Sequence, residues 1–277
     1  MVTAIVAWLS VDARKPSAPY LASDSRISWT LPSAPFSTWS WDYGRKIFSP
    51  LEPPEIVGYC GDVLFPSMVL GQIVEKIDRG LFFIERHSRP LDRFEALADA
   101  IIALHVDYPN REKREFSIIY CARDGSGMEC KFFAARLTWS SEGWARKIVE
   151  MPTESGIIIN LGSGSTKVRE KYRDWISQDG VSTSRAAFGS FCDPLSEGSI
   201  PSVGGAPQLA GLFRKGPAIL HGAVYGGAQF YQGHPVDGRV REKITEWRNE
   251  LFEVCDCCGT RRAESQRHAR ATMRQDN

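Results

Sequence analysis

Three residues near the start of the chain have the types needed for nucleophilic catalysis. Thr3 lies in a short β-prone run, and Asp24 and Lys46 follow it. A threonine hydroxyl is a poor nucleophile unless a base removes its proton, and the α-amine of an N-terminal residue, with a reference pKa of about 8, can be that base. A nearby lysine would keep the amine neutral, and an aspartate would hold the lysine in place. This order of residues predicts a hydrolase whose nucleophile is an N-terminal threonine.

The elements that must position these residues alternate between blocks of strands and pairs of helices. Alternating or continuous apolar runs predict strands, and apolar residues three or four positions apart predict helices. We expect strands at 3–9, 19–27, 56–60, 115–121, 128–136, 156–161 and within 208–224, and helices at 65–78, 91–105, 166–176 and 184–189. Two packed sheets between two helical layers require this order. The predicted fold class is therefore α+β, a four-layer αββα sandwich.

Five short motifs in this order resemble the proteasome β-subunit and HslV group of N-terminal nucleophile hydrolases. They are Thr3–Val6, Asp24–Arg26, Lys46 before Ile47, Gly58–Asp62 before one helix and Leu161–Ser165 before another. The resemblance covers residues 1–225. It implies the αββα sandwich, hydrolysis of amide bonds without metal or cofactor, and assembly into rings.

The resemblance also implies a role for each matching residue. Thr3 would be nucleophile and base, with Asp24 and Lys46 as its charged partners. The backbone N–H of Gly61 would donate to the oxyanion, and Ser163 would be a polar support near the amine. The implied partners are a peptide or protein substrate, further copies of the same chain in a homo-oligomer, and an ATPase as a candidate partner.

The start of the chain departs from the family pattern. Val2 precedes Thr3, so removal of Met1 alone would leave Thr3 with an amide nitrogen, which cannot act as a base. A further cleavage is required. In self-processing relatives a glycine usually precedes the threonine, whereas the β-branched Val2 crowds attack on its own carbonyl. The alternative function is therefore a catalytically inactive, proteasome-like scaffold subunit of an oligomeric assembly.

A second departure lies in the segment 202–206, which resembles the Ser-Gly-Gly turn of the family. Val203 stands where a supporting serine is expected, and the aspartate three residues earlier falls on Ile200. Asp193 and Ser196 keep the Asp-x-x-Ser spacing slightly upstream. They would substitute for the missing pair if the loop were rearranged.

Composition narrows the class of protein. The 277 residues are 43% apolar, and 34 basic side chains balance 33 acidic ones to a net charge of +1. No field therefore attracts nucleic acid or an anionic membrane. No apolar run approaches the ~18 residues of a membrane span, so we expect a cytoplasmic protein. Seven cysteines, two of them within apolar strands (Cys60 and Cys121), fit reduced thiols better than a disulfide framework.

The chain divides into a main domain at 1–225 and an extension at 226–277. Apolar residues at helical spacing predict one amphipathic helix over 239–254, and the arginine-rich residues 259–277 predict a mobile basic tail.

Two other constellations suggest different chemistry. Cys255, Cys257 and Cys258, with His268 further on, are of zinc-ligand type, but they lack the usual pair spacing, so plain thiols are the main interpretation. The segment 162–167 between a strand and a helix offers backbone amides to a phosphate, but it lacks the spacing of a nucleotide-binding loop.

Apolar side chains also gather outside the expected core. Trp29, Trp39 and Trp41 lie between Ile27 and Tyr43, where prolines predict a loop, and residues 81–84 form a second cluster between two helices. Both segments either fold back on the chain or form contacts between copies. We expect self-association into a closed homo-oligomer.

Overall fold

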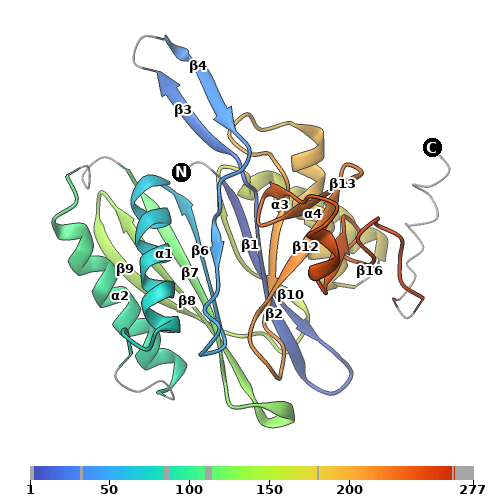
Figure 1. The fold of residues 1–277 in the computed structure, drawn as a ribbon, viewed down its shortest axis with the longest axis horizontal. Coiled ribbons are helices and arrows are strands. Elements are labelled where there is room, and N and C mark those ends of the chain that lie inside the picture. The colour runs from blue at the N-terminus through green and yellow to red at the C-terminus, as the bar shows by residue number, and fades with distance from the viewer. Residues whose placement is uncertain are drawn as a thin grey trace.

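The computed structural model describes residues 3–31, 34–83, 88–109, 114–179, 181–263 and 265. These residues form a mixed α/β fold with mainly antiparallel sheets (Figure 1). The α-helices are α1 (Leu64–Asp78), α2 (Pro90–Val106), α3 (Ser165–Asp179) and α4 (Ser184–Glu197). All lie where apolar spacing predicts helices, which confirms those predictions.

The larger sheet contains nine strands in the order β10-β1-β2-β11-β12-β13-β14, with β15 beside β12 and β16 beside β15. Its strands are β1 (Ala4–Val11), β2 (Pro16–Ser23), β10 (Gly156–Gly162), β11 (Gln208–Gly211), β12 (Ile219–Tyr225), β13 (Ala228–Tyr231), β14 (His234–Pro235), β15 (Trp247–Asn249) and β16 (Val254–Cys255). The sheet therefore continues past Gly226 without a break in its strand order.

A second sheet has the order β5-β6-β7-β8-β9. Its strands are β5 (Ile47–Phe48), β6 (Glu55–Gly61), β7 (Phe116–Asp124), β8 (Lys131–Ser140) and β9 (Gly143–Val149). The sequence analysis does not predict β9. Four of its seven residues, Ala145 to Ile148, are exposed, so it lacks the apolar alternation that marks a half-buried strand.

Three apolar clusters hold these elements together. Phe94 of α2 packs in a cluster with the β6–β7 region of the smaller sheet. Ile5 and Ile119, one from each sheet, share a second cluster, and Trp8 and Phe188 join β1 to α4 in a third. Figure 1 shows α1 and α2 on one side of the molecule and α3 and α4 on the other.

Helix ends follow local chemistry. Pro90 opens α2, where its missing N–H loses no hydrogen bond. The Thr183 side chain accepts from the Ala186 N–H at 3.0 Å at the start of α4, and Gly198 ends that helix in the left-handed conformation. The helix runs past Pro194, so it is longer than the predicted 184–189.

The loop predicted between Ile27 and Tyr43 is wrong. The segment forms an antiparallel ribbon of β3 (Ile27–Leu31) and β4 (Ala34–Trp41), which projects from the body in Figure 1. Pro35 lies at the register shift between the Leu31–Ala34 and Thr30–Thr38 pairs. Each strand has one neighbour, so a residue without an N–H is tolerated there.

The amphipathic helix predicted over 239–254 is also wrong. The described chain has a 3₁₀ turn at Arg241–Lys243, followed by β15 and β16. Trp247 pairs with Gly222 in parallel and with Cys255 in antiparallel register, and it packs against Val224. Apolar residues spaced as in a helix, such as Trp247, are thus buried here by strand pairing. Of the predicted basic tail, residues 264 and 266–277, His268 among them, lie outside the described residues.

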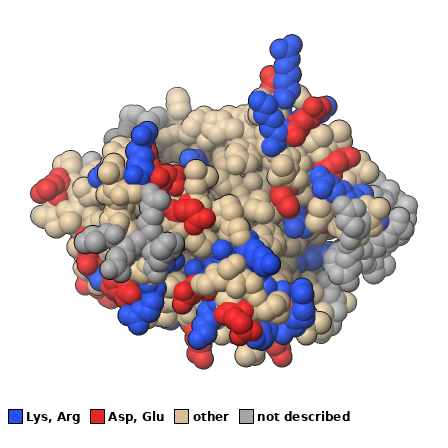
Figure 2. Space-filling view, turned by 60° about the horizontal axis from the view of Figure 1, so that its bottom comes forward, with Lys and Arg blue, Asp and Glu red and all other residues tan. Residues whose placement is uncertain are grey.

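No described helix combines the length and apolar character that a membrane crossing requires. Figure 2 shows basic and acidic side chains interspersed over one face of the molecule, with no continuous field of one sign. This distribution agrees with the net charge of +1.

Candidate active site

Strands β1 and β2 bring Thr3 and Asp24 together. Thr3 immediately precedes β1 and Asp24 immediately follows β2, and the two strands pair in antiparallel register. The Ala4 N–H donates to Asp24 Oδ1 at 3.1 Å, and the Asp24 N–H donates to the Ala4 carbonyl at 3.2 Å. The sheet register therefore holds the carboxylate against the start of β1.

Lys46 completes the cluster. Its Nζ donates to Thr3 Oγ1 at 3.0 Å, to Asp24 Oδ1 at 2.7 Å and to the Arg26 carbonyl at 2.7 Å. Thr3, Asp24 and Lys46 are each 0% exposed. These acceptors match the three N–H groups of an ammonium. The structure thus brings together three residues that span 43 positions of sequence.

Burial sets the proton affinity of this lysine. Desolvation lowers the pKa of Lys46, and the adjacent Asp24 carboxylate opposes part of that effect. A buried amine with a lowered pKa and a hydroxyl 3.0 Å away can exchange a proton with that hydroxyl.

The Asp24 carboxylate is fixed by main-chain donors. Oδ2 accepts from the Gly204 N–H at 3.2 Å and from the Arg26 N–H at 3.3 Å, in addition to the bonds of Oδ1. Gly204 belongs to the turn in which Val203 replaces the expected serine. Val203 is buried in the apolar core beside α4, while the neighbouring amide still reaches the carboxylate.

Ser163 meets the main chain of Thr3. Its hydroxyl lies 3.4 Å from the Thr3 carbonyl oxygen and 2.9 Å from the hydroxyl of Ser202. The Thr3 carbonyl also accepts from the Gly164 N–H at 3.3 Å. Gly162 has a φ of +89°, and a Cβ there would lie 2.0 Å from the Thr3 carbonyl oxygen. A glycine is therefore required for this approach.

The described contacts of Gly61 are with the neighbouring strand. Gly61 ends β6 opposite Phe116, with a φ of +104°, and a Cβ there would lie 2.3 Å from the Glu115 carbonyl oxygen. A side chain at position 61 would therefore collide with the neighbouring backbone, which explains why a glycine is needed there. Its role as oxyanion donor stays a prediction.

One further buried polar residue, Gln208, contacts this cluster and is not predicted from the sequence. Its Oε1 accepts from the Lys46 N–H at 2.9 Å, and its Nε2 donates to the carbonyls of Asp24 and Gly44 at 3.2 and 2.7 Å. Gln208 is 1% exposed at the start of β11. A polar residue before an apolar strand gives no sequence signal for this role.

Asp193 and Ser196 make hydrogen bonds at α3 and α4, and their substitution for the missing aspartate and serine stays a prediction. Asp193 accepts from the Trp175 indole N–H at 2.8 Å, which links α3 to α4. The Ser196 hydroxyl donates within α4, to the carbonyl of Cys192 at 3.0 Å. The described hydrogen bonds of both residues therefore lie outside the Thr3 cluster.

The backbone of Thr3 has an unusual conformation, with a φ of 114°. This value is rare for any residue other than glycine, and Thr3 is β-branched. Such a conformation costs on the order of 1–3 kcal/mol and persists where surrounding contacts enforce it. The bonds to the Thr3 carbonyl and the Ala4 N–H are those contacts.

The alternative chemistries gain no support from the described residues. Cys255 is buried, Cys257 is half-buried and Cys258 is exposed, and no group of three potential ligands able to hold a metal occurs within the described part of the chain. In the segment 162–167, the Gly164 N–H is bonded to the Thr3 carbonyl and is not free for a phosphate.

Comparison with known proteins bears on the fold. The sequence matches no protein-family model and no curated protein. The structure is similar to a chain from the helical assembly of the Anbu complex from Pseudomonas aeruginosa, with a TM-score of 0.51 and 15% identity over 78% of this chain and 86% of that chain. Anbu is a proteasome-like assembly. At this identity the likeness shows a proteasome-like fold in coarse terms.

Proposed function

We propose that the protein is a proteasome-like N-terminal threonine hydrolase that cleaves amide or peptide bonds once the Val2–Thr3 bond has been cut. The observation that carries the proposal is the bond between Lys46 Nζ and Thr3 Oγ1 at 3.0 Å, with Asp24 on the same amine. After the cut, Thr3 Oγ1 attacks the substrate carbonyl and its proton passes to the free α-amine. The Gly61 N–H is the proposed donor to the oxyanion.

The buried lysine also suggests how the cut is made. Thr3 Oγ1 attacks the Val2 carbonyl as Lys46 takes the hydroxyl proton. The C–N bond then breaks as Lys46 returns that proton to the Thr3 nitrogen, which leaves as the amine and gives an ester. Water hydrolyses the ester and leaves Thr3 as the first residue. The φ of 114° favours this reaction, because a residue with no preceding carbonyl carries no φ strain.

The clusters between helices and sheets support the finer αββα arrangement. One cluster joins the smaller sheet to α1 and α2, one joins the two sheets, and one joins β1 to α3 and α4. In this arrangement the nucleophile at the start of β1 lies at one end of the sheets.

The alternative is a non-catalytic scaffold subunit, and one observation favours it. The Thr3 side chain is 0% exposed as the chain stands, so a substrate carbonyl has no access to Oγ1 before processing. A protein that never loses Met1 and Val2 would keep the fold and the assembly without the chemistry.

Intact mass and peptide hydrolysis separate these functions. The purified protein should lose Met1 and Val2 and cleave fluorogenic peptides. Thr3→Ser should process and cleave at a reduced rate, whereas Thr3→Ala should do neither. Lys46→Met should lower both rates by at least about a hundredfold, because it removes the proton acceptor. It should remain folded, since Asp24 keeps its bonds to the N–H groups of Ala4, Arg26 and Gly204.

The control is Lys131→Met, which removes an exposed lysine at the start of β8 and should leave both rates unchanged. A full-length mass in every preparation, with no hydrolysis, would establish the scaffold function. Processing that continues in Lys46→Met would remove this lysine from the mechanism.

We further propose that the active form is a homo-oligomer joined through the β3–β4 ribbon. The structural neighbour is a helical assembly, which is consistent with association of this chain. The ribbon presents Trp29 and Trp39, which are 46% and 63% exposed. A second copy is the occupant that suits it, because residues 27–41 carry no charge and like surfaces can meet there without repulsion.

A further inference from the structure

A cavity of about 460 Å³ lies away from the Thr3 cluster. Its lining is Glu52, Pro53, Pro54, Arg93, Arg123, Asp124 and Gly125. The start of β6 and the end of β7 flank it, whereas Gly61 and Phe116 pair at the other end of the same strands. Tyr59, whose N–H donates to the Lys46 carbonyl at 3.2 Å, lies four residues along β6 from Glu55, or ~13 Å. The cavity volume is within the usual range for small-molecule sites.

Arg123 is a buried cation without a carboxylate partner. It is 7% exposed. Its Nε donates to the Gly125 carbonyl at 2.9 Å, and its Nη1 donates to the carbonyls of Phe213 and Gly216. In the described part of the chain, no carboxylate lies within ion-pair distance of this guanidinium. Carbonyl dipoles satisfy these hydrogen bonds, and Glu52 stabilises the charge without forming an ion pair, whereas buried charges in proteins are normally paired.

Arg93 adds a second guanidinium to the same cavity. It is 4% exposed, with Nε donating to Glu55 Oε1 and Nη1 donating to the Ser88 carbonyl. Its Nη2 is buried and has no hydrogen-bond partner among the described residues. Glu55 is outside the cavity lining and also accepts from the Tyr120 hydroxyl. An unsatisfied donor on a buried cation costs several kcal/mol unless a ligand or water meets it.

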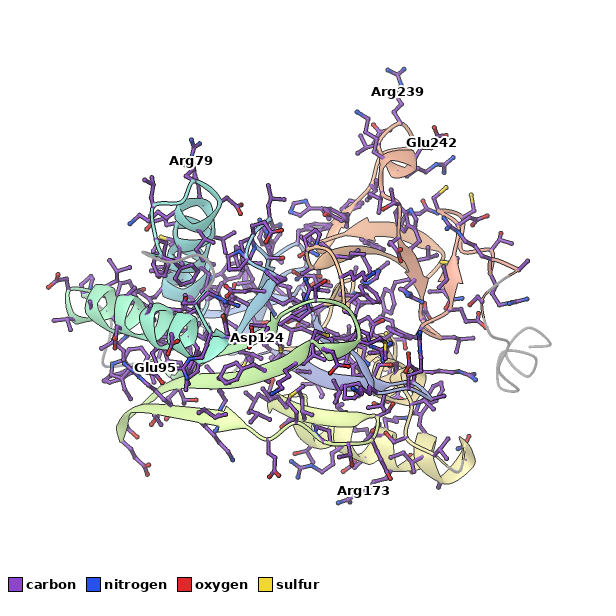
Figure 3. All side chains as sticks on the ribbon, turned by 90° about the horizontal axis from the view of Figure 1, so that it is seen from below. Arg79, Glu95, Asp124, Arg173, Arg239 and Glu242 are labelled. Carbon is purple, nitrogen blue, oxygen red and sulfur yellow. The ribbon has the colours of Figure 1, made fainter. Side chains whose placement is uncertain are left out.

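The cavity rim carries the opposite charge. Glu52 and Asp124 are both exposed, and Pro53 and Pro54 form a wall that offers no N–H donors. Figure 3 shows Asp124 near the middle of the face seen from below, with Arg173 projecting at the margin. The positive groups are thus buried while the negative groups meet solvent, which keeps the inner part of the cavity positive.

We propose that this cavity binds a small organic molecule through a carboxylate or phosphate group, with Arg123 as the main contact and Arg93 as the second. A guanidinium presents a planar fork of N–H donors that matches either oxyanion in bidentate fashion. The oxyanion compensates the charge of Arg123 and meets the open Nη2 of Arg93. The rim carboxylates repel a second anionic group, so the ligand carries its charge at one end. The site is independent of the proposed hydrolase.

Calorimetric titration of the full chain with inorganic phosphate and with butyrate, a monocarboxylate, tests the proposal, against sodium chloride at equal ionic strength. Wild type should bind at least one of the two probes at a single site. Arg123→Gln should weaken binding by about tenfold or more, since a charge-assisted contact is worth ~1.5–3 kcal/mol. Arg173→Gln, which removes an exposed arginine on α3, should bind like wild type.

A second variant keeps the test decisive if Arg123→Gln does not fold. Asp124→Asn changes an exposed side chain and should tighten binding by about two- to fivefold, because one repulsive charge is removed. Phosphate binding alone would identify a phosphate ligand, and butyrate binding alone a carboxylate ligand. The proposal is overturned if neither probe binds above the chloride control, or if Arg123→Gln or Asp124→Asn leaves the affinity unchanged.

Discussion

At the residue scale, two buried basic side chains are held away from their charged forms by the same force. Desolvation lowers the pKa of Lys46 and that of His221. Lys46 has acceptors for its protons, including the carboxylate of Asp24. Neither ring nitrogen of His221 has a hydrogen-bond partner among the described residues. A proton on Lys46 therefore has acceptors within hydrogen-bond distance, whereas Nδ1 of His221 lies 3.9 Å from Glu246 Oε2, beyond such a bond.

His221 should make the protein acid-sensitive. Burial lowers its pKa from 6.5 to about 3, with a smaller contribution from Arg248. Below pH 6.5 the unfolded chain takes up a proton that the folded chain refuses, so stability is fully present above 6.5 and falls towards pH 3. The slope is up to about 1.4 kcal/mol per pH unit. Urea unfolding at several pH values should show a shallower fall for His221→Gln.

The quantity to follow is the difference in the free energy of unfolding between wild type and His221→Gln. At about pH 7.5 that difference gives the packing cost of the substitution alone, because His221 is neutral in both states. If the difference stays constant down to about pH 4, His221 does not titrate as described.

At the scale of elements, the β10–α3 connection acts as a template for the start of β1. Gly162 and Gly164 approach the Thr3 carbonyl so closely that the conformations of the three residues depend on one another. The strain at Thr3 and the glycines of this turn are two parts of one arrangement.

Gly162→Ala should disrupt this arrangement. The new Cβ would meet the Thr3 carbonyl oxygen at 2.0 Å, so β1 must shift. We expect a loss of stability of more than ~2 kcal/mol and loss of Thr3 processing. Thermal unfolding and intact mass measure the two effects.

Gly143→Ala is the matched control. Gly143 has a φ of +99°, but a Cβ there would meet no atom within 4 Å. This variant therefore reports backbone strain alone, on the order of 1–3 kcal/mol. Equal losses in both variants would mean that contact with Thr3 contributes nothing.

Sequence predicts the helices and about half of the strands, because apolar periodicity is a local signal that burial rewards directly. The order of the residues along the chain also leads to the hypothesis that Asp24 and Lys46 lie beside Thr3, and the hydrogen bonds show this proximity. It fails where pairing partners decide the structure. Trp247 forms a strand because Gly222 and Cys255 lie beside it. Gln208 joins the site because β11 pairs with β2, where Gln208 lies opposite Ser23, far away in sequence.

At the scale of the whole molecule, the β3–β4 ribbon is the feature least explained by the body itself. Trp29 pairs with Trp39 and Ile27 with Trp41, so these four share one face, while Ser28 and Ser40 pair on the other. A two-stranded ribbon is marginally stable alone in water. The second apolar segment is partly accounted for, since Phe82 and Phe83 pack against the core cluster of α1 and α2, while Ile84 lies outside the described residues.

Association through the ribbon should respond to one charge on its aromatic face. Trp39→Asp should convert a larger species into a monomer of 30.9 kDa, because it places a charge where two copies would meet. Light scattering at micromolar concentration measures the mass. Ser40→Asp adds the same charge on the opposite face and should leave the oligomer intact. A wild-type monomer, or dissociation in both variants, would contradict an interface on the aromatic face.

The ribbon leaves and re-enters the body through a closed neck. The Gly44 N–H donates to the Ser25 carbonyl at 2.8 Å, and Arg26 forms a two-bond pair with Asp42 at 2.7 and 2.8 Å. Asp24 and Lys46 lie on the body side of this neck. The number of residues in the ribbon between them therefore does not set the distance between their side chains. The ribbon is consequently a segment that can be replaced. Its length and composition can diverge, or be exchanged for a tag or another recognition module, while the geometry around Thr3 is preserved.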